Sequence, residues 1–152
     1  MDFRKKLRIG VIGGAKPGKK ALETAYQVGR LIAENEAILV CGGLSGVMEA
    51  ASKGAKDGGG LTLGILPGVL PYEANPYIDI AIATGLGYSR NSLVALNADV
   101  LIAVDGQYGT LSEIAFGRIY KKKVIGLNTW AVEGVERASS PEEAVEMALG
   151  NR

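Results

Sequence analysis

The hydrophobic pattern of the chain alternates between two periods. Short runs of consecutive apolar residues, which are typical of strands buried on both faces of a parallel sheet, occupy residues 7–12, 37–40, 61–66, 78–83, 100–104 and 124–127. Between these runs, apolar residues recur every three to four positions, as on an amphipathic helix, over residues 21–34, 45–57, 89–96, 111–120 and 141–149. Because strands and helices alternate throughout, the pattern predicts an α/β fold, a three-layer, doubly wound parallel sheet.

Polar residues indicate where two of these helices begin. Ser45 is expected to cap the helix that precedes a glycine triplet at residues 58–60. Thr110 and Glu113 have the T-x-x-E spacing of a capping box, which places a helix start at Thr110. Residues 67–77 contain three prolines, and an irregular segment of that length in a compact domain usually covers a site.

Composition narrows the classes of function. A length of 152 residues predicts a single domain over 1–152. The 17 basic and 16 acidic residues nearly cancel, so a broad basic surface for nucleic acid is not expected. The absence of histidine and the single cysteine, Cys41, exclude a Ser-His-Asp triad and a typical zinc site, and no metal site is predicted. With no signal peptide and no apolar run of membrane-spanning length, we expect a cytoplasmic protein without a membrane partner.

The stretch from Arg90 to Glu113 carries the clearest functional signal. The apolar run of residues 100–104 leads directly into the glycine-containing turn 105–109, and a helix follows. This geometry points backbone N–H groups at an anion, and ligands of open α/β sheets lie at the carboxyl ends of the strands. The sequence therefore predicts phosphate binding by residues of this turn: Gly106, Tyr108, Gly109 and Thr110. Tyr108 either stacks on the ligand or covers the turn.

Three further glycine turns follow predicted strands. They contribute the candidate ligand-binding residues Gly13, Gly14, Gly42, Gly43, Gly46, Gly85 and Gly87. The first turn nearly spells the G-x-x-x-x-G-K-[ST] phosphate loop, but Lys20 stands where a hydroxyl should hold Mg²⁺, so an NTPase site is not favoured. One glycine turn alone is most simply a tight connection. The turns after strands two, four and five together favour a phosphate-bearing ligand in a crevice over those strands.

Arg90 and Glu113 each allow two interpretations. Glu113 either completes the capping box, or faces the crevice and acts on a sugar or a water molecule. Near a helix N-terminus its ionised form would be favoured, which suits a base or an electrostatic stabiliser better than an acid. Arg90 stands at a helix start, where an acidic residue would suit the helix dipole, so it indicates an anionic partner; the alternative is an ordinary surface arginine.

At these residues the chain resembles the Rossmann-like family of lonely guy (LOG) cytokinin-activating phosphoribohydrolases, formerly misnamed lysine decarboxylases. That family carries an arginine followed by P-G-G-x-G-T-x-x-E. Arg90 matches the arginine, and the loop and glutamate are matched by Gly106, Gly109, Thr110 and Glu113. A closer likeness is to the short branch with molybdenum-cofactor carrier proteins and DNA-processing protein A relatives. Its motifs here are V-I-G-G, C-G-G-x-x-G-V-M-E-A, G-I-L-P-G, A-N-P-Y, T-G-L-G-x-x-R-N and G-T-L-S-E-I-A.

The resemblance implies a homodimer that binds a small-molecule phosphate ester, nucleotide-like or pterin-type, at the carboxyl-end crevice. No firmly bound cofactor is predicted; the candidate ligands are the molybdenum cofactor and a nucleoside monophosphate. As a carrier the protein would only bind such a ligand, with Asn91 of the R-N motif among the binding residues. As a phosphoribohydrolase it would use Arg90 and Glu113 to assist cleavage of an N-glycosidic bond. DNA binding, as in the DNA-processing relatives, is disfavoured by the near-zero net charge.

Three residues depart from the pattern of the enzymes. Asp105 and Gln107 replace residues of the P-G-G segment, and Leu44 occupies a place where the enzymes commonly have arginine. A carboxylate beside an anion and the loss of a cation both disfavour phosphate. We therefore expect these changes to weaken phosphate binding or to alter which ester is accepted.

Overall fold

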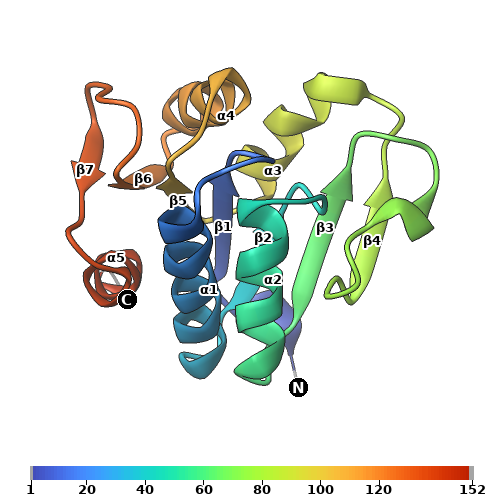
Figure 1. Ribbon diagram of the computed structural model, residues 1–152, viewed down its shortest axis with the longest axis horizontal. Helices are drawn as coiled ribbons and strands as arrows, with labels where there is room; N and C mark the ends of the chain where they lie inside the picture. Colours follow the sequence, from blue (N-terminus) through green and yellow to red (C-terminus); the bar gives the residue numbers. More distant parts are fainter. Residues whose placement is uncertain (1, 151–152) are drawn as a thin grey trace.

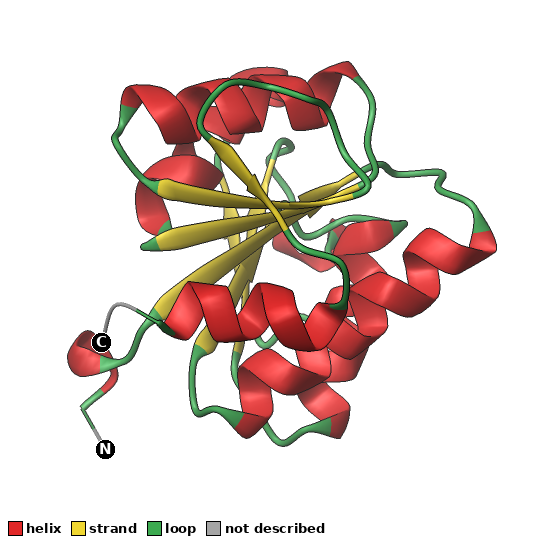
Figure 2. Cartoon of the chain, turned by 90° about the vertical axis from the view of Figure 1, so that its left-hand side faces the viewer, coloured by secondary structure: helices red, strands yellow, loops and turns green. Residues whose placement is uncertain are grey.

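A computed structural model, which describes residues 2–150, shows a seven-stranded parallel sheet between two layers of helices (Figures 1 and 2). The strands are β1 (Arg8–Gly13), β2 (Ile38–Cys41), β3 (Thr62–Leu66), β4 (Ile80–Ala83), β5 (Val100–Val104), β6 (Lys123–Leu127) and β7 (Val135–Arg137). The α-helices are α1 (Lys19–Glu34), α2 (Val47–Asp57), α3 (Asn91–Asn97), α4 (Tyr108–Ile119) and α5 (Pro141–Leu149). Short 3₁₀ turns are η1 (Phe3–Lys5), η2 (Pro71–Glu73) and η3 (Gly87–Arg90). The Rossmann-like three-layer fold predicted from the sequence is confirmed.

The strand order places a topological switch point at the centre of the sheet. The order is β4-β3-β2-β1-β5-β6-β7, so the chain moves outward from β1 to β4 and then crosses back to β5 on the other side of β1 (Figure 1). Gly13 and Val104, the last residues of β1 and β5, are paired in register. The turns that follow these two strands therefore leave the sheet side by side, at the place where ligands of open α/β sheets bind.

The strand at this switch point is buried on both faces. All residues of β5 are buried, as the uninterrupted apolar run predicted. Val100, Ile102 and Val104 belong to the core under α1, α2 and α5, whereas Leu101 and Ala103 belong to the core under α3 and α4. Packing from both sides fixes the height at which β5 ends, and this positions the turn that follows it.

Two boundaries and one strand differ from the sequence predictions. β7 was not predicted, because its residues Val-Glu-Arg are mostly exposed and contain no apolar run. Helix α4 begins at Tyr108 with Gln107 as its N-cap, so Thr110 is not a cap and the predicted capping box is wrong. Gly106, at φ 109°, turns the chain earlier than expected. Similarly, Gly46 and not Ser45 is the N-cap of α2.

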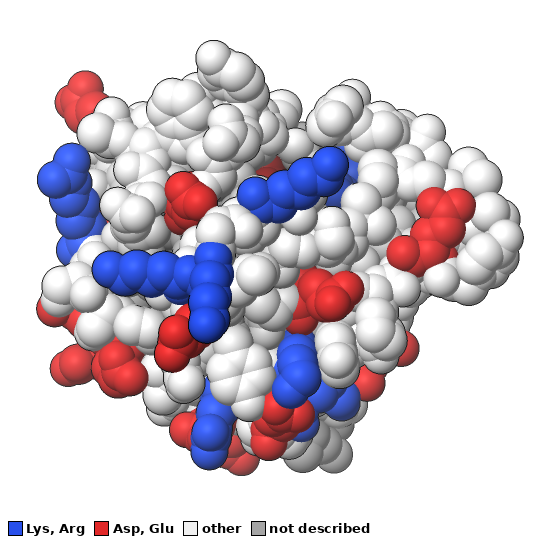
Figure 3. Space-filling model, in the orientation of Figure 1, with Lys and Arg blue, Asp and Glu red and all other residues white. Residues whose placement is uncertain are grey.

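On the face shown in Figure 3, lysine and arginine side chains are interspersed with aspartate and glutamate, without a continuous patch of one sign. Several are paired, for example Lys53 with Asp57 at 3.1 Å and Arg30 with Glu34 at 2.8 Å. Among residues 2–150, no helix has both the length and the apolar character needed to span a bilayer.

Helices α1 and α2 pack through glycines that bring their backbones together. A Cβ added at Gly54 would lie 2.0 Å from the carbonyl oxygen of Tyr26, and one added at Gly29 would lie 1.9 Å from that of Ala51. Both contacts are with backbone, which a rotamer change cannot relieve. The absence of a side chain at these positions therefore sets the distance between the two helices.

We expect Gly54→Ala to lower the free energy of unfolding by about 1–3 kcal/mol, because overpacking outweighs the gain of about 1 kcal/mol in helix propensity. Gly18→Ala is the control, since nothing lies within 4 Å of a Cβ at that position; its effect should stay below about 1 kcal/mol. Urea unfolding of the three proteins measures both. A Gly54→Ala protein as stable as the natural one would contradict the close helix contact.

Candidate functional site

A cavity of about 430 Å³ lies at the carboxyl ends of β1, β2 and β5. It is bounded by the β1–α1 turn, the start of α2, the η3–α3 junction and the β5–α4 turn. The residues predicted for the site that line this cavity are Gly13, Gly14, Arg90, Asn91, Gly106, Gly109, Thr110 and Glu113. Segments far apart in the sequence thus meet at the switch point of the sheet.

Arg90 is buried at the wall of this cavity, with only 7% of its surface exposed, so its interpretation as a surface arginine is wrong. Gly42 makes room for the guanidinium, because a Cβ at that position would lie 2.7 Å from Nη2. Nη2 donates to the carbonyl oxygen of Gly42 at 3.4 Å, and Nη1 donates to Oδ1 of Asn91. Nε has no hydrogen-bond partner among residues 2–150. A buried cation with an unused donor is suited to receive an anion.

Glu113 lies on α4 beside this arginine and is equally buried. Burial raises the pKa of its carboxyl group from 4.5 to about 8, and the positive charge of Arg90 only partly opposes this. Glu113 is therefore protonated at neutral pH, and the expectation that the helix dipole keeps it ionised is wrong. It is the sixth residue of α4, beyond the first turn in which the dipole acts strongly.

The charges around Arg90 leave a net positive site. No ion pair joins Arg90 to a carboxylate among residues 2–150. Burial lowers the pKa of its guanidinium, but an arginine remains protonated at physiological pH. With Glu113 neutral and Arg90 charged, the pair presents one positive charge and one O–H donor to the cavity. Both features favour a bound anion.

Asn91 connects Arg90 to the first turns of α4. Its Oδ1 accepts from the guanidinium, and its Nδ2 donates to Oγ of Ser112 at 3.1 Å and to the carbonyl oxygen of Gly109 at 3.5 Å. Only 3% of the residue is exposed. Because both ends of its amide are already bonded within the protein, Asn91 orients Arg90 relative to α4.

The glycine turns bring the surrounding backbones into close contact. Val47 N–H, at the start of α2, donates to the carbonyl oxygen of Gly14 at 3.0 Å. A Cβ at Gly46 would lie 2.3 Å from that oxygen, and one at Gly106 would lie 2.3 Å from Oγ1 of Thr110. Gly42, Gly43 and Gly46 therefore support the site from outside the cavity, and Gly106 allows the tight turn before α4.

The β5–α4 turn is fixed by a loop that sequence reasoning missed. Thr129 Oγ1 donates to the carbonyl oxygen of Asp105 at 2.6 Å, and Trp130 Nε1 donates to that of Gln107 at 3.0 Å. The Trp130 ring also packs against Tyr108 at 5.8 Å between centroids. Tyr108 is exposed and does not line the cavity. It packs on Trp130 beside the turn, and its stacking on a ligand stays a prediction. Residues 128–134 carry no motif or apolar period that would have indicated this function.

The turn after β4 lies at the edge of the sheet. Two strands, β3 and β2, separate β4 from β1, so Gly85 and Gly87 do not line the cavity, although Tyr88 of the following 3₁₀ turn does. The crevice that holds Arg90 and Glu113 thus lies over β1, β2 and β5. Other cavity residues outside the prediction are Ala15, Lys16, Pro17 and Met48.

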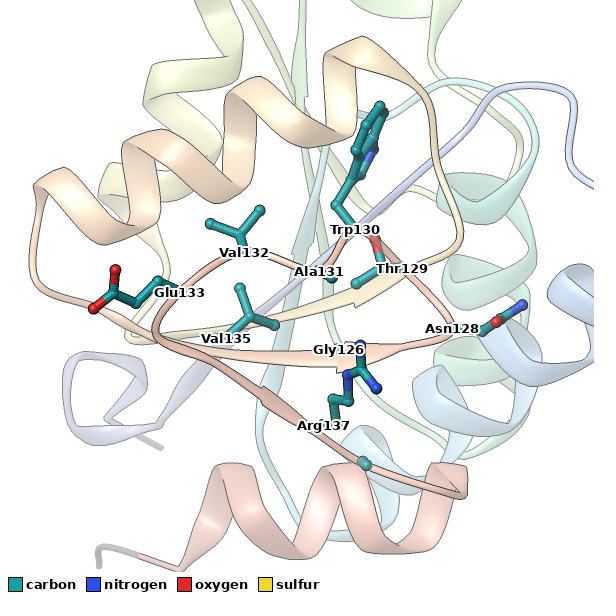
Figure 4. A pocket seen from close by; sticks show the side chains of 10 residues that line it. Gly126, Asn128, Thr129, Trp130, Ala131, Val132, Glu133, Val135 and Arg137 are labelled. Carbon is teal, nitrogen blue, oxygen red and sulfur yellow. The ribbon is translucent and has the colours of Figure 1, made fainter.

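A separate cavity of about 460 Å³ lies beside β6 and β7 (Figure 4). It is enclosed by the loop that carries Thr129, Trp130 and Val132, and Arg137 lies on its β7 side. It contains none of the predicted site residues. Cys41 is buried and lines neither cavity, and burial raises the pKa of its thiol, as expected for a small core residue. Within residues 2–150, no cluster of three or more His, Cys, Asp or Glu residues could hold a metal ion.

Comparison with solved structures finds the same fold in molybdenum-cofactor proteins. The molybdenum cofactor binding protein from Rippkaea orientalis matches with a TM-score of 0.91 and 41% identity, over 97% of this chain and 98% of that one. The molybdenum cofactor carrier protein of Chlamydomonas reinhardtii matches with a TM-score of 0.87 and 36% identity, over 96% and 98%. DNA processing protein A from Streptococcus pneumoniae, at 18% identity and a TM-score of 0.76, shares the fold.

Comparison with known sequences gives the family. An uncharacterized protein of Archaeoglobus fulgidus is 44% identical over 97% of each chain. A probable cytokinin riboside 5′-monophosphate phosphoribohydrolase of Oryza sativa is 38% identical over 70% of this chain, a match that spans 46% of the rice protein. The model of the SLOG cluster4 family matches residues 6–150. The chain therefore belongs to the SLOG cluster4 family and has LOG phosphoribohydrolases among its homologues.

Proposed function

We propose that this protein binds a phosphate ester of the nucleotide or pterin type in the cavity at Arg90, and that it acts as a carrier of the molybdenum-cofactor type. The observation that carries the proposal is the buried guanidinium of Arg90, whose Nε has no partner in residues 2–150. Leaving such a charge buried is unfavourable unless a ligand compensates it. A phosphate group, with three acceptor oxygens and negative charge, matches that requirement.

The rest of the cavity accommodates the remainder of such a ligand. Its volume of about 430 Å³ falls in the range of small-molecule sites. The N-cap of α4, Gln107, supplies no side-chain hydrogen bond to the first N–H groups of the helix. Gly109 and Thr110 of this first turn line the cavity, and uncapped N–H groups at a helix start are favourable for an anion. Pro17, Leu44 and Met48 supply apolar walls for a flat ring.

Leu44 and Glu113 favour a carrier over a hydrolase. Leu44 stands where the LOG enzymes commonly have arginine, so a second cation for the phosphate is missing. Glu113 is protonated at neutral pH and cannot serve there as the ionised group that activates water or stabilises a developing positive charge on a sugar. The similarity in size and structure to the molybdenum-cofactor proteins supports the same conclusion.

The second candidate function is a nucleoside 5′-monophosphate phosphoribohydrolase. It is favoured by the juxtaposition of Arg90 and Glu113 at one cavity and by the rice LOG relative. In that reaction a protonated Glu113 would donate its proton to the departing base, the role of a general acid. The chain spans about half the length of the LOG relatives it matches.

We expect Arg90→Gln to weaken binding of nucleoside 5′-monophosphates at least tenfold, since a charge-assisted hydrogen bond contributes about 1.5–3 kcal/mol. Isothermal titration calorimetry measures the effect. Arg118→Gln is the matched control, because Arg118 is exposed and lies in the last turn of α4, the helix that carries Glu113. The Arg118→Gln protein should bind the nucleotides with the affinity of the natural protein. Equal affinities for the natural and Arg90→Gln proteins would exclude this cavity as the phosphate site.

A turnover assay separates the two candidate functions. With a panel of nucleoside 5′-monophosphates we expect binding without release of free base, as measured by chromatography after long incubation. Release that is lost in Glu113→Ala would instead establish a phosphoribohydrolase with Glu113 as a catalytic residue. Molybdenum cofactor added to the same protein should raise its melting temperature. If the melting temperature does not change, the molybdenum cofactor is not the ligand.

The raised pKa of Glu113 predicts a pH-dependent stability. The folded protein holds the proton up to about pH 8, whereas the unfolded chain releases it near pH 4.5. This contribution is fully present below pH 4.5 and is lost as the pH rises toward 8. Glu113→Gln should therefore be increasingly more stable, relative to the natural protein, between pH 5 and pH 8. Urea unfolding at several pH values tests this, and a constant difference would mean that Glu113 is ionised throughout.

A further inference from the structure

Asp105 stands at the boundary between two cavities. It lines the cavity at Arg90 and also a neighbouring one of about 450 Å³, which lies between the starts of α1 and α5. Among residues 2–150, it is the one residue that lines both. The polar side chains of the neighbouring cavity include Lys20, Thr24 and Ser139. A ligand in the first cavity that extends past the β5 turn must therefore pass Asp105.

The backbone of Asp105 is held firmly while its side chain is not. Its N–H donates to the carbonyl oxygen of Leu127 at 3.1 Å, and its own carbonyl oxygen accepts from Thr129 at 2.6 Å. The carboxylate forms no hydrogen bond or ion pair with any residue in 2–150. Aspartate tolerates a positive φ because its side chain can form a hydrogen bond with nearby backbone groups, so an aspartate with only this role usually forms such a bond. Here both carboxylate oxygens have no partner among residues 2–150, in a residue that lines both cavities.

The replacement of proline by Asp105 also changes the backbone. Asp105 has a φ of 53°, which the ring of proline forbids. A P-G-G turn, as in the LOG enzymes, could not take this conformation. The exchange therefore does more than add a charge, because it also permits a backbone conformation that proline forbids.

The acid and the cation occupy different parts of the cavity. Nη2 of Arg90 contacts Gly42, which follows β2, whereas Asp105 follows β5 and donates its N–H to Leu127 of β6. Because β1 lies between β2 and β5, Asp105 and the guanidinium lie over different strands. A phosphate at Arg90 would consequently leave the other end of the ligand near Asp105. A carboxylate there disfavours binding of a second anionic group or of a ring edge that carries only acceptors. It favours binding of a ring whose edge carries N–H donors.

We propose that Asp105 selects the ring of the bound phosphate ester, by accepting both N–H groups of a cyclic guanidine edge such as pterins and guanine present. On this edge a ring N–H and an exocyclic amino group lie side by side and match the two oxygens of one carboxylate. Adenine presents one amino group beside a ring acceptor, so it would leave one carboxylate oxygen opposed to a lone pair. The inference rests on the proposed phosphate site and names the class of ligand it takes.

The test compares GMP with AMP, which carry the same ribose 5′-phosphate on different rings, together with 6-hydroxymethylpterin monophosphate. Calorimetry on the full chain should show GMP, the pterin phosphate or both binding at least about tenfold more tightly than AMP, as expected for a bidentate contact. In Asp105→Asn the preference for GMP or the pterin phosphate over AMP should fall below about threefold. An amide offers one donor and one acceptor, which match the ring acceptor and the amino group of adenine. Asparagine tolerates positive φ, so this variant keeps the turn.

Asp99→Asn is the matched control. Asp99 lies just before the first residue of β5, at the opposite end of the strand from Asp105. Its carboxylate accepts a hydrogen bond from the backbone N–H of Arg8 at 2.8 Å. The same change of acid to amide at that position should leave the preference between GMP and AMP as it is in the natural protein.

The outcomes distinguish this inference from the proposed function. Equal binding of all three probes, or a preference over AMP that survives in Asp105→Asn, overturns the role of Asp105. If Arg90→Gln still abolishes binding in that case, the phosphate site stands. Failure of all three probes to bind overturns both proposals. Between the two supporting results, tighter binding of the pterin phosphate than of GMP identifies a pterin ligand, and the reverse identifies a guanine nucleotide.

Discussion

The burial of Arg90 without a carboxylate partner is the constraint on which the functional site depends. A guanidinium in the interior must be surrounded by acceptors or face a ligand. The protein supplies a carbonyl oxygen from Gly42 and an amide oxygen from Asn91, which leaves Nε unused. The missing side chain at Gly42 and the bond from Asn91 to Ser112 hold the guanidinium at the cavity wall. An anion would complete this arrangement.

The switch point of the sheet brings the other groups to the same place. β1 and β5 are adjacent although almost ninety residues separate them in the chain, and their register aligns Gly13 with Val104. The turn after β5 is then fixed from the opposite side by Thr129 and Trp130. Burial between α4 and the sheet also keeps Glu113 protonated. Arg90 therefore has no carboxylate to form an internal ion pair among residues 2–150, and this supports the proposal that the cavity binds an anion.

The motifs that identify the family do not by themselves identify the chemistry. Arg90 and Glu113 are retained, as in the LOG relatives, but their surroundings include Leu44 and Asp105. In the proposed site, the first residue lacks the cation that the LOG enzymes commonly have there, and the second supplies a carboxylate at the β5–α4 turn. Retained and altered residues together support the proposal of a site that binds a phosphate ester and discriminates between rings.

The sequence determined the strands, the helices, the Rossmann-like class and the family, because apolar period and motif spacing are local properties of the chain. It also identified Arg90 and Glu113 as the residues to examine. Tertiary structure decided what the sequence left open: Thr110 is not a helix cap, Glu113 is neutral, Asn91 serves Arg90, and Gly85 and Gly87 lie at the sheet edge. These outcomes depend on strand order, burial and packing between distant segments. No local pattern encodes them, and the short exposed β7 and the Thr129–Trp130 loop were missed for the same reason.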